Sequence, residues 1–376
     1  MGDAVVRPGV AGSQSAYRSA GVDTAAQDAA LSSLAQRLRG TWSNHGRPSL
    51  DFGHYANIIT MGPVGVAIST DGIGTKALIA QLMDKYDTVG IDCVAMNVND
   101  VLCVGAVPQT MVDYIAVERI DHRVLTEIGK GLADGASQAG ISIIGGETAQ
   151  LPEVIRGEKD GGGFDLAGTC LGLVRPDGAI TGSRVEAGDT IIGLRSSGIH
   201  SNGLTLARAA FGLTSAKPLS ERRRIAAEYY AELGSMLGEE LLRPTRIYVP
   251  EVLALLDEGV DVRGLAHITT DGFLNLPRLG ADAGYVIDAL PEPHPIFAMI
   301  QDLGDVSDAE MYEVFNMGIG MCVIVPGGEA AAALDVLAKL QQEASAIGHV
   351  VADAQRTVDI TPRRLRGRRH EGLASY

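Results

Sequence analysis

Apolar positions along the chain recur with two periods, and these predict the order of helices and strands. Residues 64–69 and 165–174 are short apolar runs, which are typical of strands. In residues 76–86 the apolar side chains return every three or four positions, as on one face of a helix. The same reasoning predicts further strands at 109–117, 141–146, 189–194 and 321–325, and further helices at 24–38, 88–104, 204–211, 220–242 and 328–343.

A turn-rich break at Arg175-Pro176-Asp177-Gly178 divides this pattern into two parts. A length of 376 residues also suggests two domains. We therefore expect an arm with one helix over residues 1–50, a first domain over 51–175 and a second over 176–360. Residues 361–376 hold five arginines between Arg363 and Arg369, and we expect them to form a basic, flexible tail.

Charge and composition exclude several classes of protein. A net charge of -15 argues against a general nucleic-acid binder. No run approaches 18 apolar residues, so no membrane span is expected, and the start of the sequence lacks the apolar core of a signal peptide. The cysteines form no CxxC pair, which argues against a zinc site or disulfide framework and favours reduced thiols in the cytoplasm. These cysteines are Cys93, Cys103, Cys170 and Cys322.

A glycine-rich loop at residues 69–76, Ser-Thr-Asp-Gly-Ile-Gly-Thr-Lys, joins a predicted strand to a predicted helix. Glycines let backbone N–H groups approach an anion, and Lys76 adds a full positive charge. Asp71 would repel a phosphate, unless Mg²⁺ lies between the two. The alternative is an ordinary turn in which Asp71 caps the helix.

The helix predicted at 88–104 is mostly apolar but carries Asp92, Asn99 and Asp100 on one face. Polar groups on a buried helix must find partners. This face either meets solvent or holds a metal or nucleotide phosphate, and Asp71 offers a matching carboxylate for the second case.

Four further segments carry polar groups beside predicted strands. Gly145-Gly146-Glu147 comes directly after the apolar residues 141–144 of the predicted strand, where it forms either a ligand loop or a simple turn. Residues 196–203, Ser-Ser-Gly-Ile-His-Ser-Asn-Gly, offer hydroxyl, amide and N–H donors and suit a phosphate. His267 with residues 269–272, and Phe315-Asn316-Met317-Gly318, border apolar segments, and a lone histidine in such a place is more often a satisfied core group than an acid or base. Together these loops favour phosphoryl transfer.

These motifs occur in the order seen in the aminoimidazole ribonucleotide synthetase family, the phosphoribosylformylglycinamidine cyclo-ligases, and the chain resembles that family from about residue 17 to residue 360. The resemblance also rests on residues 17–23, Tyr-Arg-Ser-Ala-Gly-Val-Asp, and 244–249, Pro-Thr-Arg-Ile-Tyr-Val. It implies an α+β fold of two α/β-sandwich-like domains. The first domain's sheet would pair with its twin across a homodimer to form a barrel.

The resemblance implies cyclisation of formylglycinamidine ribonucleotide to aminoimidazole ribonucleotide with ATP and Mg²⁺, and no nucleic acid or membrane as partner. The roles that it implies are as follows: Asp71 and Asp100 for Mg²⁺; Thr70, Gly72, Gly74, Thr75, Lys76 and Asn99 for ATP; Ser196, Ser197, His200, Ser201 and Asn202 for the ribosyl phosphate; and His267, Glu147 and Asn316 for catalysis.

The chain departs from the family pattern at three places. Arg18 stands where lysine is usual, Asp271 where a glycine is usual, and residues 51–55 where a Gly-Gly-Phe run is usual. These departures bear on substrate fit more than on ATP use. A related ATP-dependent phosphotransferase, such as a thiamine-monophosphate kinase or selenophosphate synthetase, and a non-catalytic binding paralogue are the alternatives.

Overall fold

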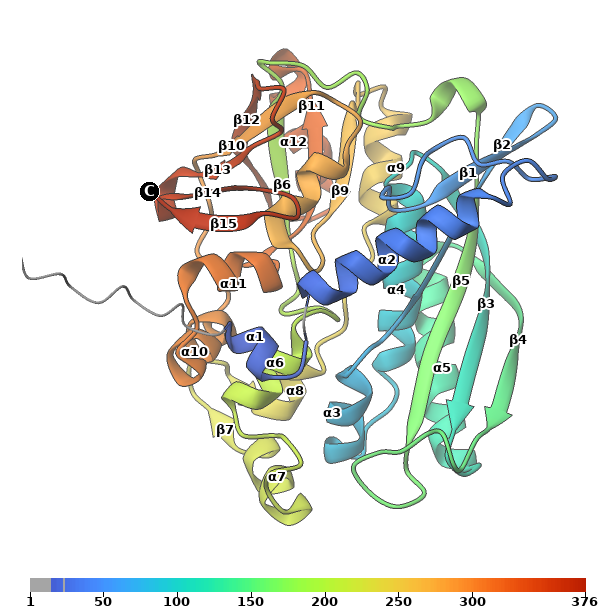
Figure 1. Ribbon diagram of the computed structural model, residues 1–376, viewed down its shortest axis with the longest axis vertical. Helices are drawn as coiled ribbons and strands as arrows, with labels where there is room; N and C mark the ends of the chain where they lie inside the picture. Colours follow the sequence, from blue (N-terminus) through green and yellow to red (C-terminus); the bar gives the residue numbers. More distant parts are fainter. Residues whose placement is uncertain (1–14, 23) are drawn as a thin grey trace, which may run out of the picture.

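The computed structural model describes residues 15–22 and 24–376, and Figure 1 shows their arrangement. The arm that we expected to be loosely ordered falls mostly in residues 1–14, outside the described residues. A short helix α1 (Ala16–Ser19) precedes α2 (Thr24–Arg39), which confirms the helix predicted at 24–38.

The first half of the chain forms a five-stranded sheet in the order β1-β2-β5-β3-β4. All neighbours are antiparallel except β3 and β4, which are parallel. The strands confirm the four that the sequence predicts in this half. They are β1 (Asn57–Met61), β2 (Val64–Gly72), β3 (Val107–Val117), β4 (Ser142–Gln150) and β5 (Phe164–Val174).

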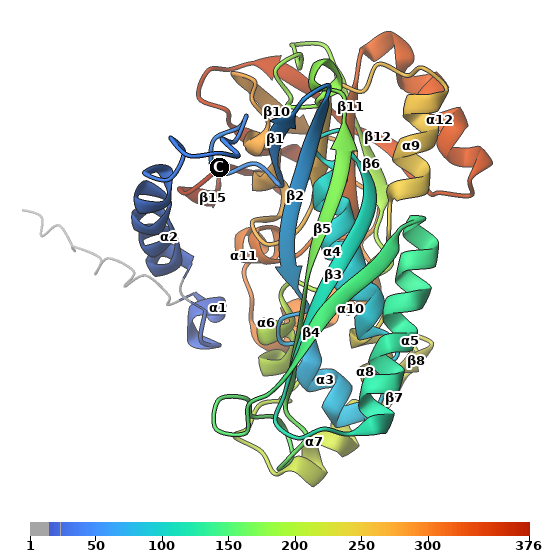
Figure 2. The ribbon, with the colours of Figure 1, turned by 90° about the vertical axis from the view of Figure 1, so that its right-hand side faces the viewer.

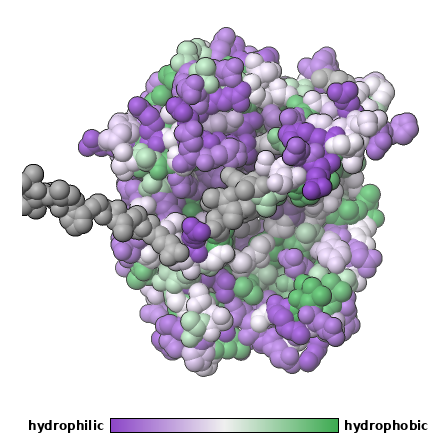
Figure 3. Space-filling view, viewed as in Figure 1, coloured by the Kyte–Doolittle hydropathy of each residue, from purple (hydrophilic) through white to green (hydrophobic). Residues whose placement is uncertain are grey.

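One face of this sheet is covered by helices and the other is open. Figure 2 shows the open face toward the viewer, with α4 (Val89–Leu102) behind the strands and α5 (His122–Ala139) beside it. Helix α3 (Lys76–Met83) follows β2 directly, and its start and that of α4 confirm the sequence prediction to within a residue. Apolar side chains that point to the open face are 37–70% exposed: Ile68, Val112, Tyr114, Ile144 and Leu173. In Figure 3, apolar residues reach the surface on the side where β4 lies.

Helices α4 and α5 cross at two glycines that no other residue could replace without a backbone shift. A Cβ on Gly90 would lie 2.2 Å from the backbone nitrogen of Leu132, and one on Gly131 would lie 2.3 Å from the Asp87 oxygen. The contact packs the buried face of α5 against α4, which is the helix that carries Asp92, Asn99 and Asp100.

We expect Gly90→Ala to lower the free energy of unfolding by about 3 kcal/mol, because the methyl group would force the two helix backbones apart. Gly129→Ala is the matched control, since Gly129 is an exposed glycine of α5 with open space around its Cβ position. That variant should be up to about 1 kcal/mol more stable than wild type. Urea unfolding of both variants measures the difference, and equal stabilities would contradict the close crossing.

The second half forms an eight-stranded sheet in the order β15-β14-β13-β10-β12-β6-β11-β9. Helices α9 (Val249–Asp257) and α12 (Ala330–Lys339) pack together near β6 and β12. Three more helices lie below the sheet in Figure 1, namely α6 (Leu204–Ala210), α10 (Pro295–Gly304) and α11 (Asp308–Val314). The strands are β6 (Thr190–Arg195), β9 (Gly264–His267), β10 (Ala283–Ile287), β11 (Ile319–Val325), β12 (Ala344–Ala352), β13 (Val358–Ile360), β14 (Leu365–Arg368) and β15 (Gly372–Ser375).

The prediction of one helix over 220–242 is wrong. Helix α7 (Leu219–Ala226) is followed by a small hairpin of β7 (Tyr229–Tyr230) and β8 (Ser235–Met236), and then by α8 (Leu237–Leu241). Gly234 has φ +65°, a left-handed conformation, and lies in the turn between β7 and β8.

The prediction of a flexible tail over 361–376 is also wrong. The segment instead adds β14 and β15 to the edge of the sheet. Leu365 and Leu373 are buried, and the Arg366 guanidinium pairs with the Asp359 carboxylate. The arginines of this segment therefore belong to strands and their connecting turns rather than to a frayed end.

Two mixed sheets with helices packed against them confirm the α+β class. The four cysteines are buried and unpaired, as expected of reduced thiols. Among the described helices, none has the length and apolar character to cross a membrane.

Candidate functional site

The end of β2 is fixed against α4 by one amide side chain. The Asp71 backbone N–H donates to Asn97 Oδ1 over 3.0 Å, and Asn97 Nδ2 donates back to the Asp71 carbonyl over 3.1 Å. This pairing holds Asp71 in place although it lies where strand becomes loop.

Asp71, Asp100 and His267 meet where the two halves of the chain face each other. His267 ends β9, its side chain is fully buried, and its Nδ1 lies 2.9 Å from Asp100 Oδ1. Its Nε2 lies 3.4 Å from the Asn99 amide nitrogen, which can only donate. These two contacts favour the tautomer in which Nδ1 carries the proton and donates to Asp100. The sequence-predicted metal ligands and the candidate catalytic histidine are therefore brought together.

The pKa of Asp71 is raised to about 6, first by burial and second by the nearby Asp100 carboxylate. The hydrogen bond from the Gly72 N–H, and then His267 and Arg278, oppose this rise in pKa only in part. Two facing carboxylates that are short of positive charge are a suitable pair of hard oxygen ligands for Mg²⁺. Within the described residues, no group of three or more His, Cys, Asp or Glu side chains could hold a metal.

A raised pKa has a cost in stability that depends on pH. Because the folded state binds the Asp71 proton more tightly than the unfolded state, stability is lost as the pH rises from about 4 through 6. We expect metal-free Asp71→Asn to match wild type near pH 4 and to exceed its free energy of unfolding by roughly 2–3 kcal/mol above pH 6. Urea unfolding with a chelator across this range tests this, and a pH-independent difference would contradict it.

Lys76 does not face a ligand. Its side chain has no exposed surface, and its ammonium donates to Asp92 Oδ1 at 2.8 Å, to the Arg243 carbonyl at 2.7 Å and to the His200 carbonyl at 3.2 Å. An ammonium has three protons, and all three are used inside the protein. The predicted contact between Lys76 and an ATP phosphate is therefore wrong for this geometry. Thr75 remains at the loop surface and contacts Thr205 Oγ1 over 3.1 Å.

The serine-rich loop 196–203 is held by hydrogen bonds with Asn316 and by one bond within the loop. Asn316 accepts from the Ser196 hydroxyl and donates to the carbonyls of Gly198 and Ile199. His200 Nε2 accepts from the Ser197 backbone N–H over 3.2 Å. Burial, which is the main cause, and nearby cations hold the pKa of His200 well below its usual value, so the ring is neutral.

These contacts divide the predicted substrate residues, together with Asn316 from the predicted catalytic set and Asn99 from the predicted ATP set, into buried and part-exposed groups. Ser196, His200, Ser201 and Asn316 are buried and shape the loop, so they do not face an open site in this geometry. Asn202 is part-exposed and donates to Thr270 Oγ1 over 3.1 Å, which joins the loop to residues 269–272. Asn99 is likewise buried, with its amide bonded to the Arg246 carbonyl and the Tyr248 N–H.

Thr70 and Glu147 lie on the open face of the first sheet, away from Asp71. Thr70 is paired with Thr169 on the neighbouring strand β5, and Glu147 is paired with Tyr114 on β3. Side chains of neighbouring residues in a strand point to opposite faces, so Thr70 and Asp71 cannot share a site. Glu147 is in addition three strands from β2 in the sheet. The structure therefore does not bring Thr70 or Glu147 to the carboxylate pair within one chain.

Sequence reasoning missed Arg278, the cation that acts on Asp71 from the second half. It stacks over the Tyr55 ring at 4.0 Å and donates to the carbonyls of Gly53 and His54. The departure at residues 51–55 therefore supplies the platform for this arginine. Nothing in the sequence around Arg278 signals this role, since the residue stands alone between apolar neighbours.

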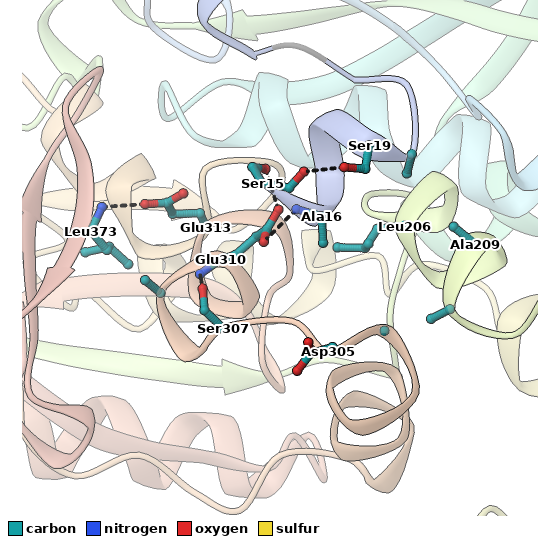
Figure 4. A pocket seen from close by; sticks show the side chains of 14 residues that line it. Ser15, Ala16, Ser19, Leu206, Ala209, Asp305, Ser307, Glu310, Glu313 and Leu373 are labelled. Carbon is teal, nitrogen blue, oxygen red and sulfur yellow. Dashed lines mark hydrogen bonds between the residues drawn. The ribbon is translucent and has the colours of Figure 1, made fainter. Parts of the chain in front are cut away.

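Two cavities lie beside the N-terminal segment. One, of about 640 Å³, is shown in Figure 4, where the Glu310 carboxylate accepts from the Ala16 N–H group. The same carboxylate also accepts from the Tyr17 N–H group. Asp71, Asp100 and His267 do not line it. An adjoining pocket of about 300 Å³ reaches from Tyr17 to Asp271. The described part of this motif, residues 17–22, thus begins close to the loop at 269–272.

Comparison with known proteins agrees with this arrangement. The family description "AIR synthase related protein, N-terminal domain" matches residues 53–174, and its C-terminal counterpart matches residues 186–361. A protein of Methanothermobacter thermautotrophicus named phosphoribosylformylglycinamidine cyclo-ligase is 50% identical over 321 residues, which cover 85% of this chain and 90% of that protein. One of the same name from Thermococcus kodakarensis is 47% identical over 90% of this chain and 96% of its own length.

Solved structures share the fold at lower identity. AaThiL complexed with AMPPCP and TMP has a TM-score of 0.60 at 15% identity and covers 90% of this chain and 94% of its own. The hydrogenase maturation protein HypE in complex with ATP has a TM-score of 0.54 at 23% identity and covers 81% and 84%. Because both family descriptions and near-full-length relatives match, the chain belongs to the AIR synthase related proteins.

Proposed function

We infer that the chain catalyses the ATP-dependent cyclisation of formylglycinamidine ribonucleotide to aminoimidazole ribonucleotide, a step of purine biosynthesis that releases ADP and phosphate. The observation that carries this assignment is the 45–50% identity, over 85–91% of the chain, to proteins named phosphoribosylformylglycinamidine cyclo-ligase. The kinase-like alternative rests on structures that are 15–19% identical, and such a likeness shows the fold alone.

Asp71 and Asp100 are the residues that would hold Mg²⁺. A bound Mg²⁺ would neutralise charge on the ATP phosphates, which is the main requirement of phosphoryl transfer. The raised pKa of Asp71 supports this role, because a cation would relieve the repulsion that causes part of the rise. We propose that His267 orients Asp100 through its Nδ1–H rather than exchanging a proton with substrate, since both ring nitrogens have protein partners.

The reaction itself needs two bond exchanges. The formamide oxygen attacks the γ-phosphorus of ATP and ADP leaves. The neighbouring nitrogen then attacks the activated carbon, phosphate leaves with that oxygen, and the nitrogen gives up a proton as the ring forms. The junction of the two halves suits these two reaction steps. Asp71 and Asp100 come from the first half of the chain, and the loops with His267 and Asn202 come from the second.

We propose a homodimer in which the open faces of two five-stranded sheets pack together. The exposed apolar side chains of β2, β3, β4 and β5 on that face support this, since monomers rarely leave so many on one surface. Thr70 and Glu147 would then lie in or beside the interface. We keep the divisions at 1–50, 51–175 and 176–360 as the proposed domains and extend the last to 376 to include β14 and β15.

The direct test is a steady-state assay with MgATP and formylglycinamidine ribonucleotide that follows ADP and the aminoimidazole product together. Equal rates of appearance are expected. ADP without the aminoimidazole would point to a different acceptor, and folded protein that binds ATP but forms neither product would contradict the assignment.

A further inference from the structure

Lys76 and Asp92 form a buried ion pair that joins the two halves of the chain. Both side chains have no exposed surface, and their charged atoms lie 2.8 Å apart. Lys76 begins α3 and Asp92 lies on α4, so both belong to the first half. Their other partners all come from the second half.

Asp92 gathers these partners on a single oxygen. Its Oδ1 accepts from the Thr245 N–H at 2.7 Å, the Thr245 hydroxyl at 2.7 Å and the Ser201 hydroxyl at 3.1 Å, besides the Lys76 ammonium. Its Oδ2 is buried without a partner. All of these hydrogen bonds therefore converge on one oxygen, so Asp92 binds the second half of the chain at a single point.

Lys76 holds the same loops from the other side through backbone carbonyls. One of these belongs to His200, whose φ of 64° is in the left-handed region that non-glycine residues avoid. Such a conformation persists only where surrounding contacts impose it. The contact from Lys76 to the His200 carbonyl is one of these, and the Asn316 bonds to Gly198 and Ile199 are others.

We propose that Lys76 and Asp92 are positioning residues that fix the loop 196–203 in the shape that receives the ribosyl phosphate of the substrate. This proposal rests on the proposed function and on the family resemblance, which implies that this loop binds the ribosyl phosphate. Ser197 and Asn202 are the part-exposed polar residues of the loop. Neither residue touches the substrate. Their effect passes through His200, Ser201 and Thr245.

Three variants separate positioning from a general loss of stability. Lys76→Met removes the contacts to both carbonyls and leaves Asp92 as a buried unpaired charge, which should also lower stability. The double variant Lys76→Met with Asp92→Asn removes that charge but retains an oxygen that can accept from Ser201 and Thr245. Lys85→Met is the control, since Lys85 is an exposed lysine paired with Asp87.

We expect both Lys76 variants to raise KM for formylglycinamidine ribonucleotide about tenfold while KM for ATP stays within about twofold. The double variant should recover thermal stability but not KM, and Lys85→Met should match wild type in both. A double variant with wild-type KM would overturn the proposal, because stability alone would then explain the single variant. A rise in both KM values by the same factor would also overturn it.

Thr245→Val serves if the Lys76 variants do not fold, because it removes one hydroxyl and keeps the shape. A severalfold rise in KM for the ribonucleotide alone is expected, and an unchanged KM would overturn the proposal. Calorimetric titration with ribose 5-phosphate gives a second readout that needs no turnover. If wild type binds ribose 5-phosphate but forms no aminoimidazole, the proposed reaction fails while the positioning role stands. If wild type and the double variant bind it equally, or wild type does not bind it, the positioning role fails.

Discussion

Replacing Asp71 with asparagine is expected to lower kcat for aminoimidazole formation by about 10³-fold or more. The change removes one of two carboxylates that would hold Mg²⁺ against the transferring phosphate, and such charge stabilisation is worth about 4 kcal/mol. The fold should survive, because the amide oxygen of the new side chain could still accept from the Gly72 N–H, as the Asp71 carboxylate does at 2.7 Å. Initial rates at several Mg²⁺ concentrations, with circular dichroism for the fold, measure both parts.

Asp160→Asn is the matched control for this prediction. Asp160 is an exposed carboxylate paired with Arg119, away from the junction of the two halves. It should retain wild-type kcat and Mg²⁺ dependence. If Asp71→Asn retained kcat within about tenfold of wild type, the assignment of the metal site would be wrong.

Replacing Val112 with glutamate is expected to convert a dimer into a monomer. Val112 lies near the middle of the open face, and twofold symmetry would bury two new carboxylates in one apolar interface. Burial of an unpaired charge costs several kcal/mol, enough to weaken association more than about 10³-fold. Sedimentation equilibrium should give about twice the chain mass of 39.3 kDa for wild type and the single mass for the variant.

Leu303→Glu tests whether any exposed apolar residue would give the same result. Leu303 is 58% exposed on α10, in the other half of the chain. This variant should remain a dimer. A monomeric wild type, or a Val112→Glu protein that stays dimeric, would refute the packing of sheet on sheet.

The sequence pattern predicted most of the fold because the relevant signals are local. Apolar runs and turn residues located β2, β3, β5, α3 and α4, and the polar face of α4 pointed to Asp100. The helix over 220–242 failed because α7 ends at Ala226 and a hairpin with Gly234 in its turn follows, although helical spacing continues in the sequence. The C-terminal strands failed because few apolar residues mark them, while their partners lie far away in sequence.

The site was predicted less completely, for a different physical reason. A lysine in a glycine-rich loop looks the same in sequence whether it faces a phosphate or a buried aspartate. The carbonyls that bind Lys76 lie 124 and 167 residues away, and only the fold brings them together. The face of the sheet to which the Thr70 and Glu147 side chains point likewise depends on strand register. By contrast, Asp71, Asp100 and His267 could be grouped because a family resemblance linked their separate loops.

The buried cysteines allow the opening of the structure to be followed by chemical modification. Burial raises the pKa of all four thiols, so they react with thiol reagents only when the surrounding structure opens. Cys93, Cys103 and Cys170 lie in the first half and Cys322 lies on β11 in the second. Mass spectrometry after timed alkylation would therefore measure the rate at which each half opens. A shared rate would mean that the two halves unfold as one cooperative unit, and different rates would identify the half that yields first.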